Sequence, residues 1–362
     1  MSAAAPIPVE NIYYLFCYAW NRFEEARSIP LGATPSPDLP NLLARVLLWG
    51  TRVILRRGLD RGYQPYEEEL ATVRGRIDLG STLRLRARRT QRLHCEFDEL
   101  SHDVPHNRIL KASLKRLACA PTLDSELAGE LRALARRFAD VTDIRLEGSA
   151  FSRIQLHRNN GYYDFLLRVA ELAFDCLLPK PTGEGFFFQD VLRDEKKMAR
   201  VFEEFVRNFY RVEQHVFSVE PLTIRWDAIS TSTGVGRLPT MRVDVFLRSR
   251  ERKIIIDTKY YARALQTFHD TDSFHSGNLY QIFSYLKNAA GGDPTFKAVE
   301  GVLLYPQTEH EIDASYSIQG HQVKVATLDL SRPWVAIEAR LLDLLDLSSL
   351  GASLNSSPHP RS

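Results

Sequence analysis

Residues 242–263 read RVDVFLRSRERKIIIDTKYYAR. Two apolar runs rich in β-branched residues flank the charged segment SRERK, a pattern that predicts a hairpin of two antiparallel strands. The second strand does not end in a turn but in Asp257-Thr258-Lys259. Side chains alternate along a strand, so Asp257 and Lys259 point to one face and Thr258 to the other. A carboxylate and an ammonium at this position are either solvated at an ordinary strand end or belong to a catalytic site.

The predicted hairpin also brings Asp244, in the first strand, close to Asp257. Two neighbouring carboxylates repel each other, and both stay ionised at low cost only when a cation lies between them. Hard oxygen ligands favour Mg²⁺ or Mn²⁺. A lysine beside such a metal can orient an attacking water and stabilise the charge of a phosphate. The residues therefore indicate metal-assisted hydrolysis of a phosphodiester.

Two predicted helices add polar side chains to this set. An apolar stripe predicts a helix over 194–210, in which Glu203 lies at one edge of the stripe and can lean over the sheet. Glu204 lies at the opposite edge and is the alternative helix acid. In a helix predicted over 277–290, Gln281 and Tyr285 are four residues apart and share a face. Gln281 could hydrogen-bond a water at the site or a DNA phosphate.

Each of these residues alone has an ordinary structural explanation, as a strand end, a solvated helix position or the margin of a helix face. Their order favours the functional interpretation: a glutamate helix, an Asp strand, an Asp-x-Lys strand and a Gln-x-x-x-Tyr helix. This order resembles the pattern of the PD-(D/E)xK nucleases. The sequence departs from that pattern because Arg242-Val243, and no adjacent proline, precedes Asp244.

The remaining sequence predicts two domains. Helical periodicity is found at 12–23, 39–59, 107–119, 125–141 and 158–178, and strands are expected within 72–98 around Gly75 and Gly80. From about residue 180 the order becomes helix, three strands, helix and two strands, which favours a mixed sheet between helices. We therefore expect an α+β N-terminal domain over 1–165. An α/β, restriction-endonuclease-like PD-(D/E)xK domain with a mixed central sheet flanked by helices follows over 166–350, with a disordered tail over 351–362.

Composition restricts the class of protein. Hydrophobic residues make up 44% and charged residues 25% of the chain, and the formal net charge is only +2, which is ordinary for a soluble protein. No apolar run is long enough to span a bilayer, and the four separated cysteines have no Cys-x-x-Cys spacing. A cytoplasmic protein with no membrane association is expected.

Positive charge is concentrated in one segment. Between Arg74 and Arg92 there are seven arginines and one acid, Asp78. Such a cluster can meet phosphates or an acidic protein surface, and the alternative is a solvated face.

Several segments together resemble the McrC family, the nuclease subunits of methylcytosine-specific McrBC restriction systems. The resemblance extends over nearly the whole chain and is carried by the following segments: IPVENIYYLFCYAW (7–20), VRGRIDL (73–79), CEFDELSHDVPHNRILK (95–111), VFEEFV, MRVDVF, IIIDTKYY and NLYQIFSYL. The first three are distinctive of this family, whereas the nuclease motifs belong to a wider superfamily.

The resemblance implies a type IV restriction endonuclease subunit that cuts double-stranded DNA with Mg²⁺. It also implies a partner, a hexameric McrB-like AAA+ GTPase that reads the methylated site, receives the N-terminal domain in its central pore and is stimulated to hydrolyse GTP. Cleavage would follow DNA translocation. This chain would bind no nucleotide itself, in agreement with the absence of a G-x-x-x-x-G-K-[ST] loop.

The resemblance also assigns roles to residues. Asp244, Asp257 and Glu203 become metal ligands, together with the carbonyl of Thr258, and Lys259 becomes the catalytic lysine beside Gln281. The following residues are expected to contact the partner or DNA: Arg74, Arg76, Arg84, Arg86, Arg88, Arg263 and Tyr285.

Two alternative functions remain open. The chain could be a non-cleaving activator of the AAA+ GTPase, although intact Asp244, Asp257 and Lys259 speak against a purely structural role. It could also be a stand-alone PD-(D/E)xK DNA nuclease, for example in repair, although such an enzyme has no need of the family-like N-terminal half.

Overall fold

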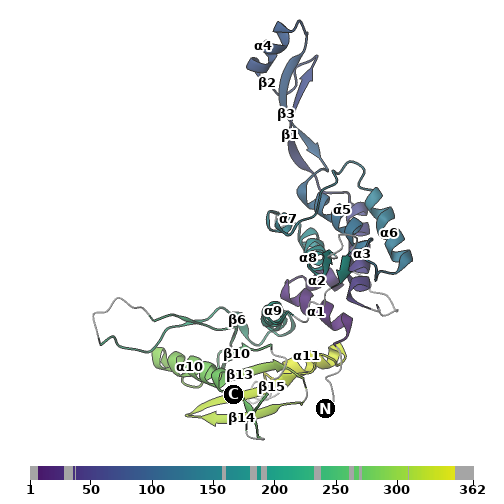
Figure 1. Ribbon diagram of the computed structural model, residues 1–362. Helices are drawn as coiled ribbons and strands as arrows, with labels where there is room; N and C mark the ends of the chain where they lie inside the picture. The colour runs from purple at the N-terminus through teal and green to yellow at the C-terminus, as the bar shows by residue number, and fades with distance from the viewer. Residues whose placement is uncertain are drawn as a thin grey trace, which may run out of the picture. The chain divides into compact units, whose positions relative to one another are not determined.

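The structure is a computed structural model, and it describes residues 7–27, 36, 38–156, 160–179, 186–188, 194–231, 238–260, 265–268, 271–308 and 310–346. The chain forms two compact units (Figure 1). Unit 1 combines Met1–Phe23 with Asp190–Ser362, and unit 2 is Glu24–Gln189. Unit 2 is therefore inserted, in sequence, into unit 1.

The elements of unit 2 are α2 (Phe23–Arg27, starting at the last residue of unit 1), α3 (Leu39–Arg57), β1 (Gly62–Leu70), β2 (Arg76–Ile77), α4 (Leu79–Ala87), β3 (Leu93–Ser101), α5 (Pro105–Leu117), α6 (Ser125–Arg136), α7 (Gly148–Ser152), α8 (Gly161–Cys176), β4 (Leu177–Pro179) and β5 (Phe186–Phe188). The elements of unit 1 are α1 (Val9–Ala19), α9 (Glu195–Glu213), β6 (Ser218–Glu220), β7 (Thr223–Ile224), β8 (Met241–Arg242), β9 (Val245–Arg248), β10 (Lys253–Thr258), β11 (Leu265–Phe268), β12 (Thr271–Phe274), α10 (Ser276–Gly292), η2 (Pro294–Phe296), β13 (Glu300–Pro306), β14 (Asp313–Ile318), β15 (His321–Leu328) and α11 (Trp334–Asp343).

The helices of unit 2 follow the sequence signals closely. Helix α3 is capped by Asp38, whose side chain accepts a hydrogen bond from the backbone N–H of Asn41, and the proline at position 40 suits the first turn. Helices α3, α5, α6 and α8 pack on one another through buried aliphatic side chains. The helices expected in these regions are confirmed.

A β-ribbon extends from the helices of unit 2 and carries α4 at its far end (Figure 1). Strand β1 pairs with β3 in antiparallel register from Gly62↔Ser101 to Leu70↔Leu93, and β2 pairs with β3 near the far end of the ribbon. The expectation of a strand around Gly80 is wrong. Asp78 accepts a hydrogen bond from the Gly80 N–H and caps a helix there instead.

Unit 1 is built on a six-stranded sheet in the order β14-β15-β13-β10-β9-β6. Strand β10 pairs in parallel with β13 and in antiparallel with β9, so the sheet is mixed. Its residues Ile254, Ile255 and Ile256 are fully or almost fully buried. The mixed sheet flanked by helices is therefore confirmed, and the segment SRERK joins its two central antiparallel strands as expected.

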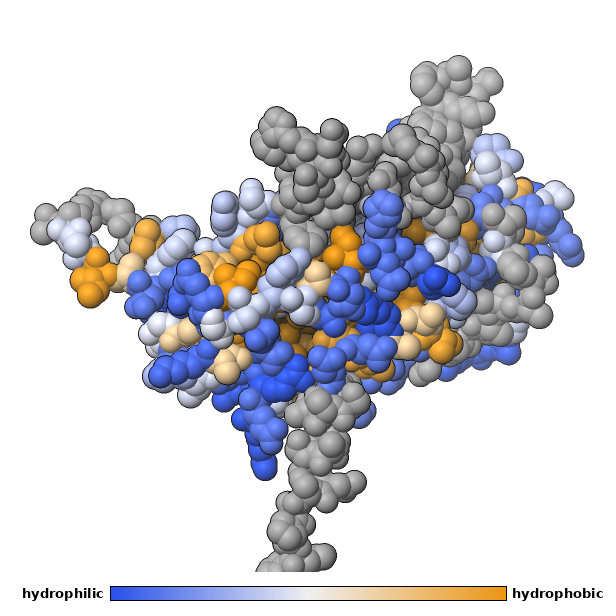
Figure 2. Space-filling view, turned by 90° about the horizontal axis from the view of Figure 1, so that it is seen from below, coloured by the Kyte–Doolittle hydropathy of each residue, from blue (hydrophilic) through white to orange (hydrophobic). Residues whose placement is uncertain are grey.

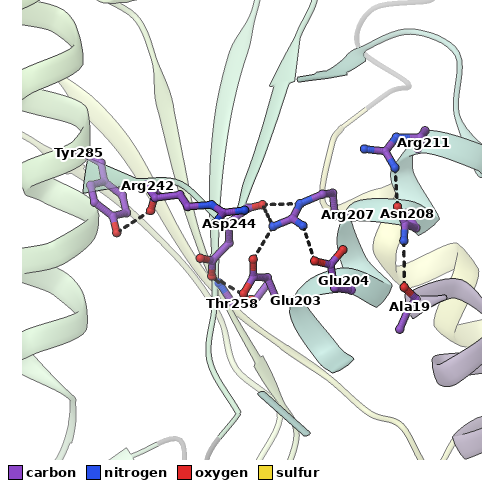
Figure 3. Close-up of polar contacts among 10 residues, drawn as sticks. All are labelled: Ala19, Glu203, Glu204, Arg207, Asn208, Arg211, Arg242, Asp244, Thr258 and Tyr285. Atoms are coloured by element: carbon purple, nitrogen blue, oxygen red, sulfur yellow. Dashed lines mark hydrogen bonds and ion pairs between the residues drawn. The ribbon is translucent and has the colours of Figure 1, made fainter. Parts of the chain in front are cut away.

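Helices α9 and α10 lie on opposite sides of the strands (Figure 3). Helix α9 buries the predicted stripe that includes Met198, Phe202 and Phe209. Helix α10 packs Ile282 and Leu286 into the core formed with Ile255. The strands and the two helices thus hold the ends of β9 and β10 in a fixed frame.

The division of the chain differs from the sequence expectation of a boundary at 165/166. That position lies inside α8, which packs against α3 and α5 of unit 2. Conversely, α1 packs against α9 and belongs to unit 1. This division depends on contacts between α1 and α9, whose residues lie about 190 positions apart in the sequence. Such contacts cannot be predicted from local periodicity.

The sequence also left several short elements of unit 1 unassigned, and with them β14 and α11. Strand β14 pairs with β15 at one edge of the sheet, and α11 packs near β15. In the view of Figure 2, apolar side chains form small separate groups among polar ones. No helix in the described ranges is long and apolar enough to cross a membrane. The tail over 351–362 lies outside the described residues.

Candidate active site

Asp244 lies in the bend between β8 and β9, at the end of the hairpin where β10 also ends. The last pair of residues between β9 and β10 is Val245 and Ile256, so Asp244 and Asp257 occupy the next position on each side. The Oδ2 atom of Asp244 accepts hydrogen bonds from the backbone N–H of Thr258 at 2.8 Å and from its hydroxyl at 3.0 Å. The hairpin thus fixes Asp244 to β10, beside Asp257.

Asp257 is a buried acid whose carboxylate lacks hydrogen-bond donors among the described residues. Its side chain is 0% exposed, and neither carboxylate oxygen accepts a hydrogen bond from any described residue. Lys259 Nζ lies 2.8 Å from Oδ2, at ion-pair distance but without hydrogen-bond alignment. Burial raises the pKa of Asp257 to about 6, and the charges of Asp244 and Glu203 raise it further against the opposing charge of Lys259. The predicted proximity of the two aspartates and of Lys259 is therefore present.

Lys259 is the first member of a chain of hydrogen bonds that reaches α10. Its Nζ donates to Gln281 Oε1 at 3.0 Å, and Gln281 Nε2 donates to the Tyr285 hydroxyl at 2.6 Å. The Tyr285 hydroxyl donates to the carbonyl of Arg242 at 3.2 Å, just before the bend (Figure 3). Burial raises the pKa of Tyr285. The Gln-x-x-x-Tyr pair therefore links the lysine to the backbone that precedes Asp244.

On the other side of the strands, α9 contributes Glu203, Glu204 and Arg207 (Figure 3). Arg207 donates to the carboxylates of both glutamates. Burial raises the pKa of Glu203, the charge of Asp244 raises it further, and Arg207 opposes both effects. Glu203 is the better candidate for the helix acid because its charge also acts on Asp257.

The structure thus brings six of the predicted residues together at one end of the sheet: Glu203, Asp244, Asp257, Thr258, Lys259 and Gln281, with Tyr285 adjacent. The predicted arginine contacts are not part of this site. Arg263 lies outside the described residues. The others lie on the ribbon of unit 2 and on α4, where Arg74 pairs with Glu99 and Arg76 with Glu96. Arg84, Arg86 and Arg88 are exposed.

The acidic side chains of the site determine which metal ion it can hold. Among the described residues, no group of three or more His, Cys, Asp or Glu side chains is arranged to hold one. Asp257 nevertheless offers two buried oxygens without hydrogen-bond partners, and within the same ranges the Oδ1 atom of Asp244 accepts no hydrogen bond. Mg²⁺ is commonly held by one or two carboxylates and retains several waters. The residues therefore fit Mg²⁺ bound by Asp244 and Asp257.

Arg207 was missed in the sequence. Its Nε and Nη2 atoms donate to the carbonyl oxygen of Asp244 at 2.8 and 2.7 Å, and its side chain is only 16% exposed. The spacing of three and four residues from the two glutamates is the signal that could have indicated an ion pair on the helix. No local signal indicates its contact with Asp244, which lies 37 residues further along the chain.

The comparisons with known proteins agree on one family. The family described as "McrBC 5-methylcytosine restriction system component" matches residues 11–306. The chain is 32% identical over 341 residues to the "Type IV methyl-directed restriction enzyme EcoKMcrBC" of Escherichia coli (strain K12), covering 94% of this chain and 97% of that protein. The chain belongs to the McrBC family. Within that family it is a McrC-like component of the restriction system.

One solved structure gives the same fold for this McrBC family member. A chain in the refined half-complex of the tetradecameric assembly of Thermococcus gammatolerans McrB AAA+ hexamers with bound McrC aligns with a TM-score of 0.57 at 16% identity. The alignment covers 94% of this chain and 76% of that chain. A chain in the Thermococcus gammatolerans McrBC complex aligns with a TM-score of 0.42 at 20% identity, over 56% of this chain and 58% of that chain.

Proposed function

We propose that this chain is the Mg²⁺-dependent DNA endonuclease subunit of a GTP-driven restriction complex that acts on methylcytosine-containing DNA. The observation that carries the proposal is Asp257, whose buried carboxylate has no hydrogen-bond partner among the described residues and lies 2.8 Å from Lys259 and next to Asp244. A buried carboxylate of this kind destabilises a fold unless a cation compensates its charge, and such groups cluster at functional sites. The order of the sequence motifs supports the assignment of unit 1 to the PD-(D/E)xK nucleases.

In this proposal Asp244 and Asp257 hold Mg²⁺, with Glu203 and the carbonyl of Thr258 as further ligands. The ion would supply Lewis acidity at the scissile phosphate and lower the pKa of water. Lys259 lies where an ammonium can neutralise developing negative charge, and its hydrogen bond to Gln281 restricts where the ammonium lies. Contacts to DNA would be mainly to phosphates and therefore salt-sensitive.

The proposed partner is a hexameric McrB-like AAA+ GTPase that reads the methylated site, consumes the GTP and moves the DNA. The solved assembly to which this chain is similar contains McrB hexamers with bound McrC, which supports a partner of this kind. Unit 2 offers a docking surface at the end of its ribbon. There α4 exposes the apolar Leu79 and Leu83, 70% and 68% exposed, next to the exposed Arg84.

A plasmid cleavage assay with the cognate GTPase, Mg²⁺ and GTP tests the proposal. The DNA is either methylated or unmethylated, and the wild-type chain is compared with Lys259→Ala. We expect cutting of methylated DNA by the wild type and a loss of at least about a hundredfold in the variant, because the charge that balances the phosphate is removed. GTPase stimulation by Lys259→Ala should equal that of the wild type, which controls for folding and partner binding.

The other outcomes correspond to the alternative functions. GTPase stimulation by the wild type without any cutting would identify a non-cleaving activator and contradict the nuclease assignment. Cutting that needs neither partner nor GTP would identify a stand-alone PD-(D/E)xK nuclease.

A further inference from the structure

The bend that carries Asp244 poses a structural problem. Strand β8 ends at Arg242 and β9 begins at Val245, so Asp244 lies in a break between two strands of different sheets. The sequence has no proline beside Asp244 to restrict the backbone there. An acid that must present its carboxylate at a defined point needs another restraint.

Hydrogen bonds from two helices supply that restraint. From α10, the Tyr285 hydroxyl donates to the carbonyl of Arg242 on one side of the bend. From α9, Arg207 donates through Nε and Nη2 to the carbonyl of Asp244 itself, and the two contacts form a fork (Figure 3). A guanidinium is suited to this task because its N–H groups are fixed in one plane.

Arg207 also joins the bend to the helix acids. Its Nη2 donates to Glu203 and its Nη1 to Glu204, while the side chain remains largely buried. Four hydrogen bonds therefore radiate from one guanidinium to α9 and to the bend. With the Thr258 contacts to its Oδ2 atom, Asp244 is restrained at both its carbonyl and its carboxylate. Its Oδ1 atom stays available.

We propose that Arg207 is a positioning residue of the nuclease site, which sets the place of Asp244 and Glu203 by holding the Asp244 carbonyl and the two helix glutamates in one network. The inference rests on the proposed function, because it assigns Arg207 a task toward the residues that would hold Mg²⁺. Residues that orient metal ligands typically change metal affinity or activity by about 10- to 100-fold when they are replaced. Arg207 would act through these residues, because its hydrogen bonds go to the Asp244 carbonyl and to the two glutamates.

The test compares Arg207→Gln and Arg207→Lys with the wild type and with Arg211→Gln. Arg211 is the matched control: it lies one turn further along α9, is exposed and bonds to Asn208 instead of the site. Two quantities are measured in the full chain. One is hydrogen exchange in the peptide 241–248. The other is the Mg²⁺ concentration at half-effect, taken both from the Mg²⁺-dependent rise in Tm and from plasmid cleavage.

For Arg207→Gln we expect faster exchange in 241–248 and a half-effect Mg²⁺ concentration raised at least about tenfold. High Mg²⁺ should restore part of the cleavage, which a general loss of folding would not allow. Arg207→Lys keeps the charge opposite the glutamates but cannot form the fork, so its exchange should also be fast and its Mg²⁺ requirement intermediate. Arg211→Gln should behave as the wild type.

Unchanged exchange and an unchanged Mg²⁺ requirement in both Arg207 variants would overturn the inference. If Arg207→Gln does not fold, Arg207→Lys decides by the same two measurements. If the wild type neither cuts DNA with its partner nor gains stability with Mg²⁺, the proposed function fails. The exchange data would then still show whether Arg207 restrains the bend.

Discussion

Asp257 shows how a single residue can oppose the stability of its own fold. Its carboxylate is buried beside Asp244 and Glu203, and only Lys259 compensates it among the described residues. At neutral pH the ionised form dominates even with a pKa of about 6, so the metal-free protein carries the cost of this buried charge. A bound cation would relieve that cost, which is why the same arrangement suits a metal site.

The pH dependence of stability follows from the sign of this shift. The pKa of Asp257 is raised in the folded state, from 3.8 to about 6, so its contribution is most favourable at low pH and is lost as the pH rises from about 4 through 6. At 1.36 kcal/mol per pKa unit, the cost at pH 8 is about 3 kcal/mol. We expect Asp257→Asn to raise the Tm of the metal-free protein at pH 8, with a gain that shrinks toward pH 4.5. Thermal unfolding in EDTA across this range measures the difference.

The exposed Asp227→Asn is the control for Asp257→Asn, since it removes a carboxylate of the same unit without changing a buried charge. Its Tm should follow that of the wild type at every pH. A lower Tm for Asp257→Asn than for the wild type at pH 8 would contradict the electrostatic account of Asp257. Mg²⁺ should raise the Tm of the wild type but not that of Asp257→Asn.

At the scale of elements, the ribbon of unit 2 separates arginines that the sequence grouped together. Arg74 and Arg76 are tied to Glu99 and Glu96 of strand β3, so their charges are partly neutralised within the ribbon. Arg84, Arg86 and Arg88 lie on α4 or directly after it and are exposed. In the proposed function, we therefore expect the partner to meet the end of the ribbon and not the whole cluster.

Charge reversal on α4 tests this surface. We expect the triple variant Arg84→Glu, Arg86→Glu, Arg88→Glu to bind the GTPase about tenfold more weakly or worse, with a lower association rate, because complementary charge guides encounter. Fluorescence-detected binding at low and physiological salt measures the effect. The matched control reverses three exposed arginines elsewhere in unit 2, Arg136, Arg137 and Arg145, with the same change in net charge. Equal affinities of the two variants would make the α4 arginines an ordinary solvated face.

The elements also show where the sequence was informative. The run Ile254–Ile256, flanked by charged residues, predicted β10, and with it the placement of Asp257 and Lys259 on one face. The segment 79–87 was assigned wrongly because its helix is short, lies within a ribbon of strands and is supported by the capping contact of Asp78 and by packing on β3. Strand β14 has exposed and half-buried positions and no strong apolar alternation, so its pairing with β15 could not be predicted from its own residues.

For the whole molecule, the main difference from the sequence expectation is the place of α1. Tyr18 stacks on Trp334, contacts the rings of Phe205 and Phe209, and donates a hydrogen bond to Glu213. The carbonyl of Tyr18 accepts a hydrogen bond from Asn208. These contacts join the first segment of the chain to α9 and α11, and the shortest of them, between Tyr18 and Phe205, spans 187 residues of sequence. The contact between Arg207 and Asp244 also joins residues that are distant in sequence. Neither contact can be predicted from the residues next to it in the chain.

The folding of unit 1 should therefore depend on its first 23 residues. We expect Tyr18→Ala to destabilise unit 1 by about 3–5 kcal/mol, the cost of removing a buried aromatic ring. Tyr280→Ala on α10, where Tyr280 is 70% exposed, should have little effect.

A fragment of residues 190–362 should expose the aromatic face of α9 and aggregate. A fusion of residues 1–23 to this fragment through a flexible linker should unfold cooperatively. Thermal denaturation and size-exclusion chromatography compare the fragment and the fusion with the full chain. A monomeric fragment 190–362 with the Tm of the fusion would show that α1 is dispensable. The C-terminal segment would then be an independent domain, as the sequence alone predicts.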